Sequence, residues 1–144
     1  MLSTKSAHCA SLGKTPNVVE LRAEPLSVRR ARSFVRRALD ERGVALETRD
    51  TMVLLASELA TNAIEHGGPP TGRTVLIFLF EQDCMLRLEV HDTERRVPVL
   101  RSGDGVAESG RGLLVVTELA TRWGIVATAA GKYVFCELPV SGER

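Results

Sequence analysis

Two stretches of the chain carry apolar residues at the three- and four-residue spacing of a helix with one buried face. The first helix is expected over residues 24–43, where Pro25 suits the opening turn and Gly43 the position just past the end. The second helix is expected over residues 46–66. The expected core positions are Val28, Ala31, Val35 and Leu39 in the first helix, and Met52, Leu55, Leu59 and Ala63 in the second.

Three further segments have the length and pattern of β-strands. Residues 17–23 form a short strand candidate. Residues 74–81 form an unbroken apolar run, which predicts a strand covered on both faces. In residues 83–92 apolar and polar side chains alternate, which predicts a strand with one buried face and one wet face.

The last part of the chain predicts a loop, a helix and a hairpin. Residues 93–109 show no periodicity and are long for a plain connection, so we expect a functional or mobile loop there. The helix that follows is expected to open at Gly110. Residues 122–128 and 132–140 have strand patterns, and the short turn between them predicts a hairpin.

Length, composition and charge fit one soluble domain over residues 17–140, preceded by a flexible tail over residues 1–16. The chain has 144 residues, of which 44% are hydrophobic, and a formal net charge of +1, which gives no reason to expect nucleic acid or a membrane as partner. No apolar run approaches the roughly 18 residues of a membrane-spanning helix, and no signal-peptide pattern opens the chain. The three cysteines lack metal spacing, and we interpret them as reduced thiols of a cytoplasmic protein.

The first helix is rich in arginine, and two interpretations are open. The arginines could form a surface that docks a partner or nucleic acid, or simply a solvated helix face. We favour the solvated face because the whole chain is almost neutral. The residues concerned are Arg29, Arg30, Arg32, Arg36, Arg37 and Arg42.

The second helix carries polar residues beside its apolar stripe. Glu58, Asn62 and His66 are four residues apart and so share one flank. At about 100° per residue, Asn62 lies about 60° and Glu58 about 100° from the core direction set by Leu59. A half-buried carboxylate or amide is costly unless something pairs with it. A structural ion pair or a loop cap would explain these residues as well as a functional site would.

Two further features, an inward carboxylate and a pair of glycines before a helix, follow the polar flank of the second helix in the sequence. Asp92 has the parity of the buried positions of its strand, so its carboxylate points inward, either as a loop cap or as an acceptor for the exocyclic amine of a base. Gly110 and Gly112 precede a helix, either as an ordinary turn or as a close approach to phosphate. In that chain order, Asp92 would hold adenine, the glycines would cradle phosphates, Asn62 would supply oxygen to Mg²⁺, and Glu58 would act as a general base.

Four segments carry a family resemblance: ELATNAIEHG from Glu58, VHDTE from Val90, GRGLLVV from Gly110 and GKYVFCELP from Gly131. Over roughly residues 17–140 the chain resembles the Bergerat-fold ATP-binding domain of gyrase-type ATPases, sensor histidine kinases and mismatch-repair ATPases. More narrowly, it is similar to the small actinobacterial anti-sigma factors that are serine/threonine kinases.

The resemblance implies a two-layer α+β sandwich, with a mixed, mainly antiparallel sheet and helices on one face. It implies ATP and Mg²⁺ as cofactors, Glu58 as the catalytic base, Asn62 as the metal ligand and residues 94–109 as a lid. The implied partners are a sigma factor held inactive and an anti-anti-sigma antagonist phosphorylated on Ser or Thr. We expect the chain to contact neither nucleic acid nor a membrane directly. A homodimer is compatible with the expected fold. The implied cofactor-binding residues are Asn62, His66, Asp92, Gly110, Arg111, Gly112 and Leu113.

Two departures from the family pattern keep other functions open. Thr93 and Glu94 follow Asp92 where the family often has a glycine, and Tyr133 stands where it often has a threonine. Both favour a non-catalytic module that keeps the fold and sequesters a partner. A detached histidine-kinase domain would need a phospho-accepting helical hairpin before it, and a gyrase-type hydrolase would need a transducer domain after residue 144.

Overall fold

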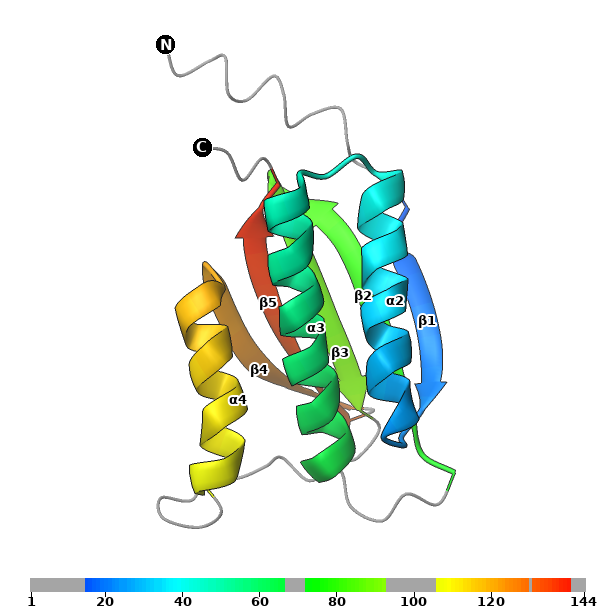
Figure 1. The fold of residues 1–144 in the computed structure, drawn as a ribbon. Helices are drawn as coiled ribbons and strands as arrows, with labels where there is room; N and C mark the ends of the chain where they lie inside the picture. The colour runs from blue at the N-terminus through cyan, green and yellow to red at the C-terminus, as the bar shows by residue number, and fades with distance from the viewer. Residues whose placement is uncertain (1–14, 67–71, 93–105, 130, 141–144) are drawn as a thin grey trace.

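The computed structural model describes residues 15–66, 72–92, 106–129 and 131–140, with only the backbone path for 106–112. Three helices and five strands follow one another in these ranges (Figure 1). They are β1 (Asn17–Arg22), α2 (Leu26–Glu41), α3 (Leu46–His66), β2 (Thr74–Gln82), β3 (Met85–Asp92), α4 (Val106–Leu119), β4 (Arg122–Thr128) and β5 (Gly131–Pro139).

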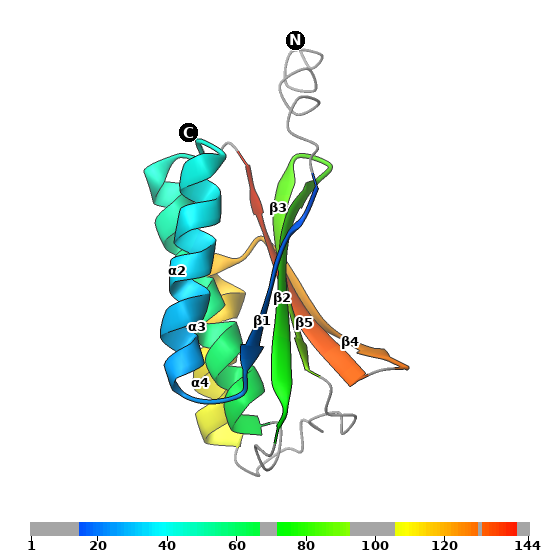
Figure 2. The same ribbon diagram turned by 90° about the vertical axis from the view of Figure 1, so that its right-hand side faces the viewer.

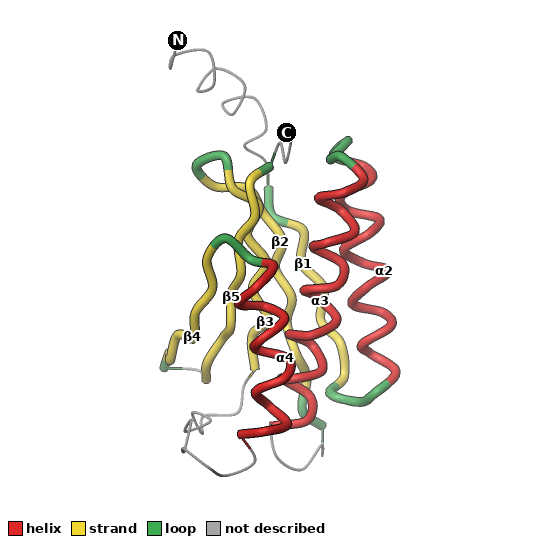
Figure 3. Tube along the Cα trace, turned by 60° about the vertical axis from the view of Figure 1, so that its left-hand side comes forward, coloured by secondary structure: helices red, strands yellow, loops and turns green. Residues whose placement is uncertain are grey.

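The strands form one sheet in the order β1-β2-β3-β5-β4, and every described neighbouring pair is antiparallel. Figures 1 and 2 show that the three helices cover one face of this sheet, and Figure 3 shows them lying side by side. The expected two-layer α+β sandwich is therefore confirmed. The expected hairpin at the end of the chain is also present, because β4 pairs with β5 from Thr128 opposite Gly131.

The core lies between the helix layer and the facing side of the sheet. All four positions expected in the second helix are buried, and three of the four in the first, with Val28 only half-buried. The sheet contributes the alternate positions of β2, β3 and β5. Apolar spacing alone thus located the buried helix faces, because each helix has a single layer to pack against. The sheet's fully buried apolar side chains include Val75, Ile77, Leu79, Leu86, Leu88 and Val90.

The expectation that β2 is covered on both faces is wrong. Its residues alternate between buried and half-buried, and Leu76, Phe78 and Phe80 lie on the side that carries no helix (Figure 2). A continuous apolar run is typical of a strand between two layers, but here it serves a sheet with an apolar outer face. We call this helix-free side of the sheet the outer face.

The hairpin between β2 and β3 is turned by two residues, Asp83 and Cys84, since Gln82 pairs with Met85. Both turn residues have positive φ, 53° and 69°, as the tight turn of a right-twisted hairpin requires. Cys84 is disulfide-bonded, so the expectation of reduced thiols is wrong for this residue. Sequence spacing does not reveal which cysteines a fold brings within bonding distance. Cys136 is free, and its burial raises the pKa of the thiol to about 12.

None of the helices in the described ranges has the length and apolar character needed to cross a membrane.

Candidate functional site

Glu58 and Asn62 lie together on one flank of α3, the central helix of the layer. Both side chains are half-buried, as the helical wheel predicted, whereas His66 at the end of the helix is exposed. Within the described residues the structure gives Glu58 and Asn62 no side-chain hydrogen bond or ion pair. The structural ion pair that could have explained these two residues is therefore absent among the residues described.

Asp92 ends β3 and points into the molecule, with its side chain only 2% exposed. Its two oxygens face two different cations. Oδ1 accepts a hydrogen bond from Nη1 of Arg73 at 2.9 Å, and Oδ2 faces Nζ of Lys132 at 3.4 Å. Both cations are also buried, with side chains 7% and 6% exposed. The inward carboxylate thus has partners within the protein, which the sequence interpretation did not anticipate.

Arg73 joins Asp92 to the end of the helix that carries Glu58 and Asn62. Its Nη2 donates to the carbonyl oxygen of Ile64 at 3.2 Å, and its Nη1 lies 3.4 Å from that of Ala63. These carbonyls belong to the last turn of α3, where the helix dipole is negative and a cation is stabilising. One guanidinium therefore fixes both the end of α3 and the carboxylate at the end of β3.

Sequence reasoning missed Arg73 and Lys132, although a signal for both was present. Arg73 precedes β2 with the parity of the buried Val75 and Ile77, so it points to the helix layer. Lys132 pairs directly with Asp92 across β3 and β5, on the same side of the sheet. Parity would have placed both cations inside the molecule, where a cation requires a carboxylate partner.

Tyr133, the departure in the closing segment, does not face this cluster. It lies on the outer face, where its ring stacks on His91 with centroids 4.4 Å apart, and His91 also contacts Phe78. The residue of the closing segment that reaches Asp92 is its neighbour Lys132. The departure at Tyr133 therefore lies on the opposite side of the sheet from the buried carboxylate.

The expectation that a helix opens at Gly110 is wrong. Helix α4 begins at Val106, so Gly110, Arg111 and Gly112 lie in its second turn. Only the first four backbone N–H groups of a helix lack an intrahelical partner, and here they belong to residues 106–109. The sequence before Gly110 contains Val, Ala and Glu, which extend the helix by one turn. Leu113 is half-buried. Of the expected lid, residues 94–105 lie outside the described residues.

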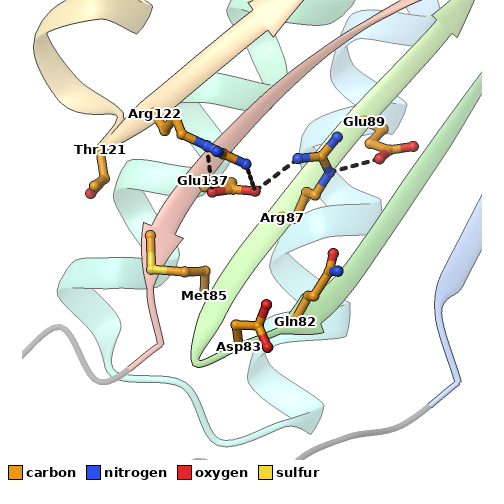
Figure 4. A pocket seen from close by; sticks show the side chains of 8 residues that line it. All are labelled: Gln82, Asp83, Met85, Arg87, Glu89, Thr121, Arg122 and Glu137. Atoms are coloured by element: carbon orange, nitrogen blue, oxygen red, sulfur yellow. Dashed lines mark hydrogen bonds and ion pairs between the residues drawn. The ribbon is translucent and has the colours of Figure 1, made fainter.

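The outer face carries a second polar arrangement, away from Glu58, Asn62 and Asp92. A pocket of about 570 Å³ there is lined by Arg87, Glu89, Arg122 and Glu137 among others (Figure 4). Arg87 bridges Glu89 at 2.7 Å and Glu137 at 2.8 Å, and its guanidinium lies 3.9 Å from the centre of the Phe135 ring. Because these carboxylates are already paired with arginine, the pocket resembles a structural ion network more than a catalytic site.

The flank of α3 has the donor set that a magnesium–nucleotide site requires. Mg²⁺ keeps several waters and takes few protein ligands beside substrate phosphates, so one amide oxygen from Asn62 next to a carboxylate fits it. In the described residues, no group of three or more His, Cys, Asp or Glu side chains is arranged to hold a metal ion.

Comparisons with known proteins identify the family of the chain. Residues 21–135 match the family model of the histidine kinase-like ATPase domain. An uncharacterized protein of Streptomyces coelicolor is 37% identical over 83 residues, which cover 56% of this chain and 78% of that protein.

Two solved structures share the fold. The structure of the RsbU and RsbW domains of Rv1364c from Mycobacterium tuberculosis matches 89% of this chain with a TM-score of 0.65 and 21% identity. The blue-light activated histidine kinase of Erythrobacter litoralis EL346 matches 69% of it with a TM-score of 0.56 and 25% identity. The matches cover 34% and 33% of those two chains, so the present chain corresponds to about one third of each.

Proposed function

The chain belongs to the histidine kinase-like ATPase domain family, and on this premise we propose that it binds Mg·ATP and transfers the γ-phosphate to a serine or threonine of a protein antagonist. A sigma factor, held inactive by the same chain, is the second proposed partner. The observation that carries the proposal is that Glu58 and Asn62 on α3 are half-buried without a side-chain partner among the described residues, while Asp92 at the end of β3 points inward.

Each residue has one role in the proposed reaction. Asp92 accepts a hydrogen bond from the amino group of adenine. Asn62 offers its side-chain oxygen to the Mg²⁺ that accompanies the phosphates, and this ion supplies charge neutralisation when bound. Glu58 accepts the proton of the substrate hydroxyl group. The hydroxyl oxygen attacks the γ-phosphorus, and ADP leaves. Residues 94–109, which include the first turn of α4, are proposed to cover the nucleotide.

The similarity to a structure that contains an RsbW domain supports the regulatory part of the proposal. At 21% identity this likeness establishes the fold. The sigma factor and the antagonist are therefore proposed as partners and are to be tested by experiment. The proposed place of action is the cytoplasm, where sigma factors work.

Two observations favour a second candidate function, a module that keeps the fold and sequesters a partner without catalysis. Asp92 already faces two buried cations, and α4 begins before the glycines that were expected to open it. If the cations serve only to neutralise Asp92, and the glycines only to continue the helix, both features weaken nucleotide binding. Calorimetry with ATP, with and without Mg²⁺, separates the candidates, because no binding at millimolar ATP would leave only the sequestering module.

The variants Glu58→Gln and Asn62→Ala test the catalytic assignment. Glu58→Gln keeps the shape but removes the base, so transfer of label from γ-labelled ATP to protein in the host lysate should fall by roughly 10²–10⁴-fold while ATP binding persists. Asn62→Ala should instead lose the Mg²⁺-dependent part of ATP binding. Glu65→Gln, an exposed carboxylate on the same helix, is the matched control and should behave as wild type. Equal transfer by Glu58→Gln and wild type would show that Glu58 is structural.

A further inference from the structure

The buried cluster of Arg73, Asp92 and Lys132 joins the end of α3 to the end of β3 and the start of β5. Its two cations hold the carboxylate differently. Arg73 is bound at 2.9 Å to Asp92 and is anchored by the carbonyl oxygen of Ile64 at 3.2 Å. Oδ1 of Asp92 is therefore hydrogen-bonded to an anchored arginine, which holds the carboxylate in one orientation.

Lys132 is held more loosely. Charge-assisted N–H···O bonds are typically about 2.7–2.9 Å long, whereas the contact between its Nζ and Oδ2 of Asp92 is 3.4 Å. An ammonium group has three N–H donors. Within the described residues, Asp92 is the acceptor that the structure gives it. A buried ammonium with one long contact is poorly compensated for its lost hydration, so it gains from a further acceptor.

Oδ2 of Asp92 and Nζ of Lys132 thus present an acceptor and a donor side by side, on directly paired residues of β3 and β5. The Watson–Crick edge of adenine has the complementary order, with the 6-amino donor next to the N1 acceptor. Guanine has an acceptor, O6, and then a donor, N1–H. Because Arg73 fixes Asp92, the pair cannot exchange places to suit guanine, whose O6 would face the carboxylate.

Resting on the proposed function, in which this site binds ATP, we propose that Lys132 is a specificity-determining residue. Its ammonium group donates to N1 of adenine while Oδ2 of Asp92 accepts from the 6-amino group. A site that hydrogen-bonds both N1 and the 6-amino group discriminates strongly between adenine and other bases. A mismatched base would leave buried polar groups of the protein unpaired. Lys132 then selects the base and does not take part in phosphoryl transfer.

The test pairs a change in the ligand with a change in the protein. The probe is 1-deaza-ATP, in which N1 is replaced by C–H and the 6-amino group is kept. By calorimetry on the purified full chain, 1-deaza-ATP should bind wild type roughly 10- to 100-fold more weakly than ATP, the effect of one hydrogen bond to a charged group. Lys132→Met should bind ATP more weakly by a similar factor and should no longer distinguish ATP from 1-deaza-ATP.

Controls separate the proposal from its premise. Lys132→Met leaves Asp92 paired with Arg73, and thermal unfolding verifies its fold. Arg37→Met removes an exposed cation from α2 and should keep the wild-type ratio of the two affinities. Equal binding of ATP and 1-deaza-ATP to wild type would overturn the role of Lys132 and leave the proposed function standing, whether or not Lys132→Met folds. Tighter ATP binding by Lys132→Met would overturn it too, by showing that lysine competes with the ligand. Absence of ATP binding to wild type would overturn both.

Discussion

At the residue scale, Arg73 holds together two parts of the candidate site that are far apart in sequence. Its guanidinium donates to the last turn of α3 and to Asp92 at the end of β3. Lys132 lies farther from the carboxylate, at 3.4 Å. Arg73 therefore contributes directly to the relative position of the adenine-binding and catalytic residues proposed above.

We expect Arg73→Met to lower the free energy of unfolding by about 3–5 kcal/mol, because removal of one partner leaves a buried carboxylate poorly compensated. Denaturation in urea, followed by circular dichroism, measures the change. Arg22→Met removes an exposed arginine from the end of β1 and should stay within about 0.5 kcal/mol of wild type. A loss below 1 kcal/mol for Arg73→Met, comparable with the Arg22 control, would mean that Arg73 is not needed to compensate the buried Asp92.

At the element scale, the β4–β5 hairpin is fitted to an aromatic ring on the outer face. Gly124 pairs with Phe135, and a Cβ at Gly124 would lie 3.1 Å from the tip of that ring. The ring cannot simply move away, because the guanidinium of Arg87 lies 3.9 Å from its centre and is held by Glu89 and Glu137. Glycine is thus required here by packing and not by backbone conformation.

Overpacking costs about 1–3 kcal/mol, and alanine regains roughly 0.5–1 kcal/mol over glycine within a strand. Gly124→Ala should therefore destabilise the protein by up to about 2 kcal/mol. The same substitution in a Phe135→Leu background should be neutral or stabilising, because the ring that it meets is gone. Chemical denaturation of wild type, both single variants and the double variant gives the coupling free energy between Gly124 and Phe135. Equal effects of Gly124→Ala in both backgrounds would contradict this account.

At the scale of the whole molecule, the two faces of the sheet are specialised. The inner face packs on α2, α3 and α4 and bears Asp92, whereas the outer face bears aromatic side chains and an ion network that connects β3, β4 and β5 (Figures 2 and 4). Burial by itself would raise the pKa of the Glu137 carboxyl. Hydrogen bonds from Arg87 and Arg122 outweigh burial and hold this pKa below its ordinary value of 4.5.

Because this pKa is lower in the folded protein than in the unfolded chain, the free energy of unfolding depends on pH in the acid range. The network stabilises the protein fully above about pH 4.5, where Glu137 is ionised in both the folded and the unfolded chain. As the pH falls through the lower pKa of the folded state, the unfolded chain binds the proton first, so the free energy of unfolding decreases. Glu137→Gln should be less stable at neutral pH and should lose less stability on acidification to about pH 3. Glu20→Gln, an exposed carboxylate on β1, should keep the wild-type slope.

The sequence by itself determined the elements and the directions of their side chains. Helix α3 begins and ends where its pattern predicted, and Glu58 and Asn62 are half-buried on its flank. Asp92 is inward because strand parity fixes the face on which each side chain lies. These properties depend only on local periodicity and on the existence of one core, so they can be read from a single chain.

Only the tertiary structure decided what those side chains meet. It paired Asp92 with Arg73 and Lys132, which precede β2 and open β5, because the antiparallel register brings these strand ends together. Among the described residues it placed the helices on one side of β2, so the apolar run of this strand lines a half-buried outer face. Partners and layers depend on contacts between distant segments. Parity within one segment predicts the face on which a side chain lies, but it does not predict which side chain of another segment meets it there.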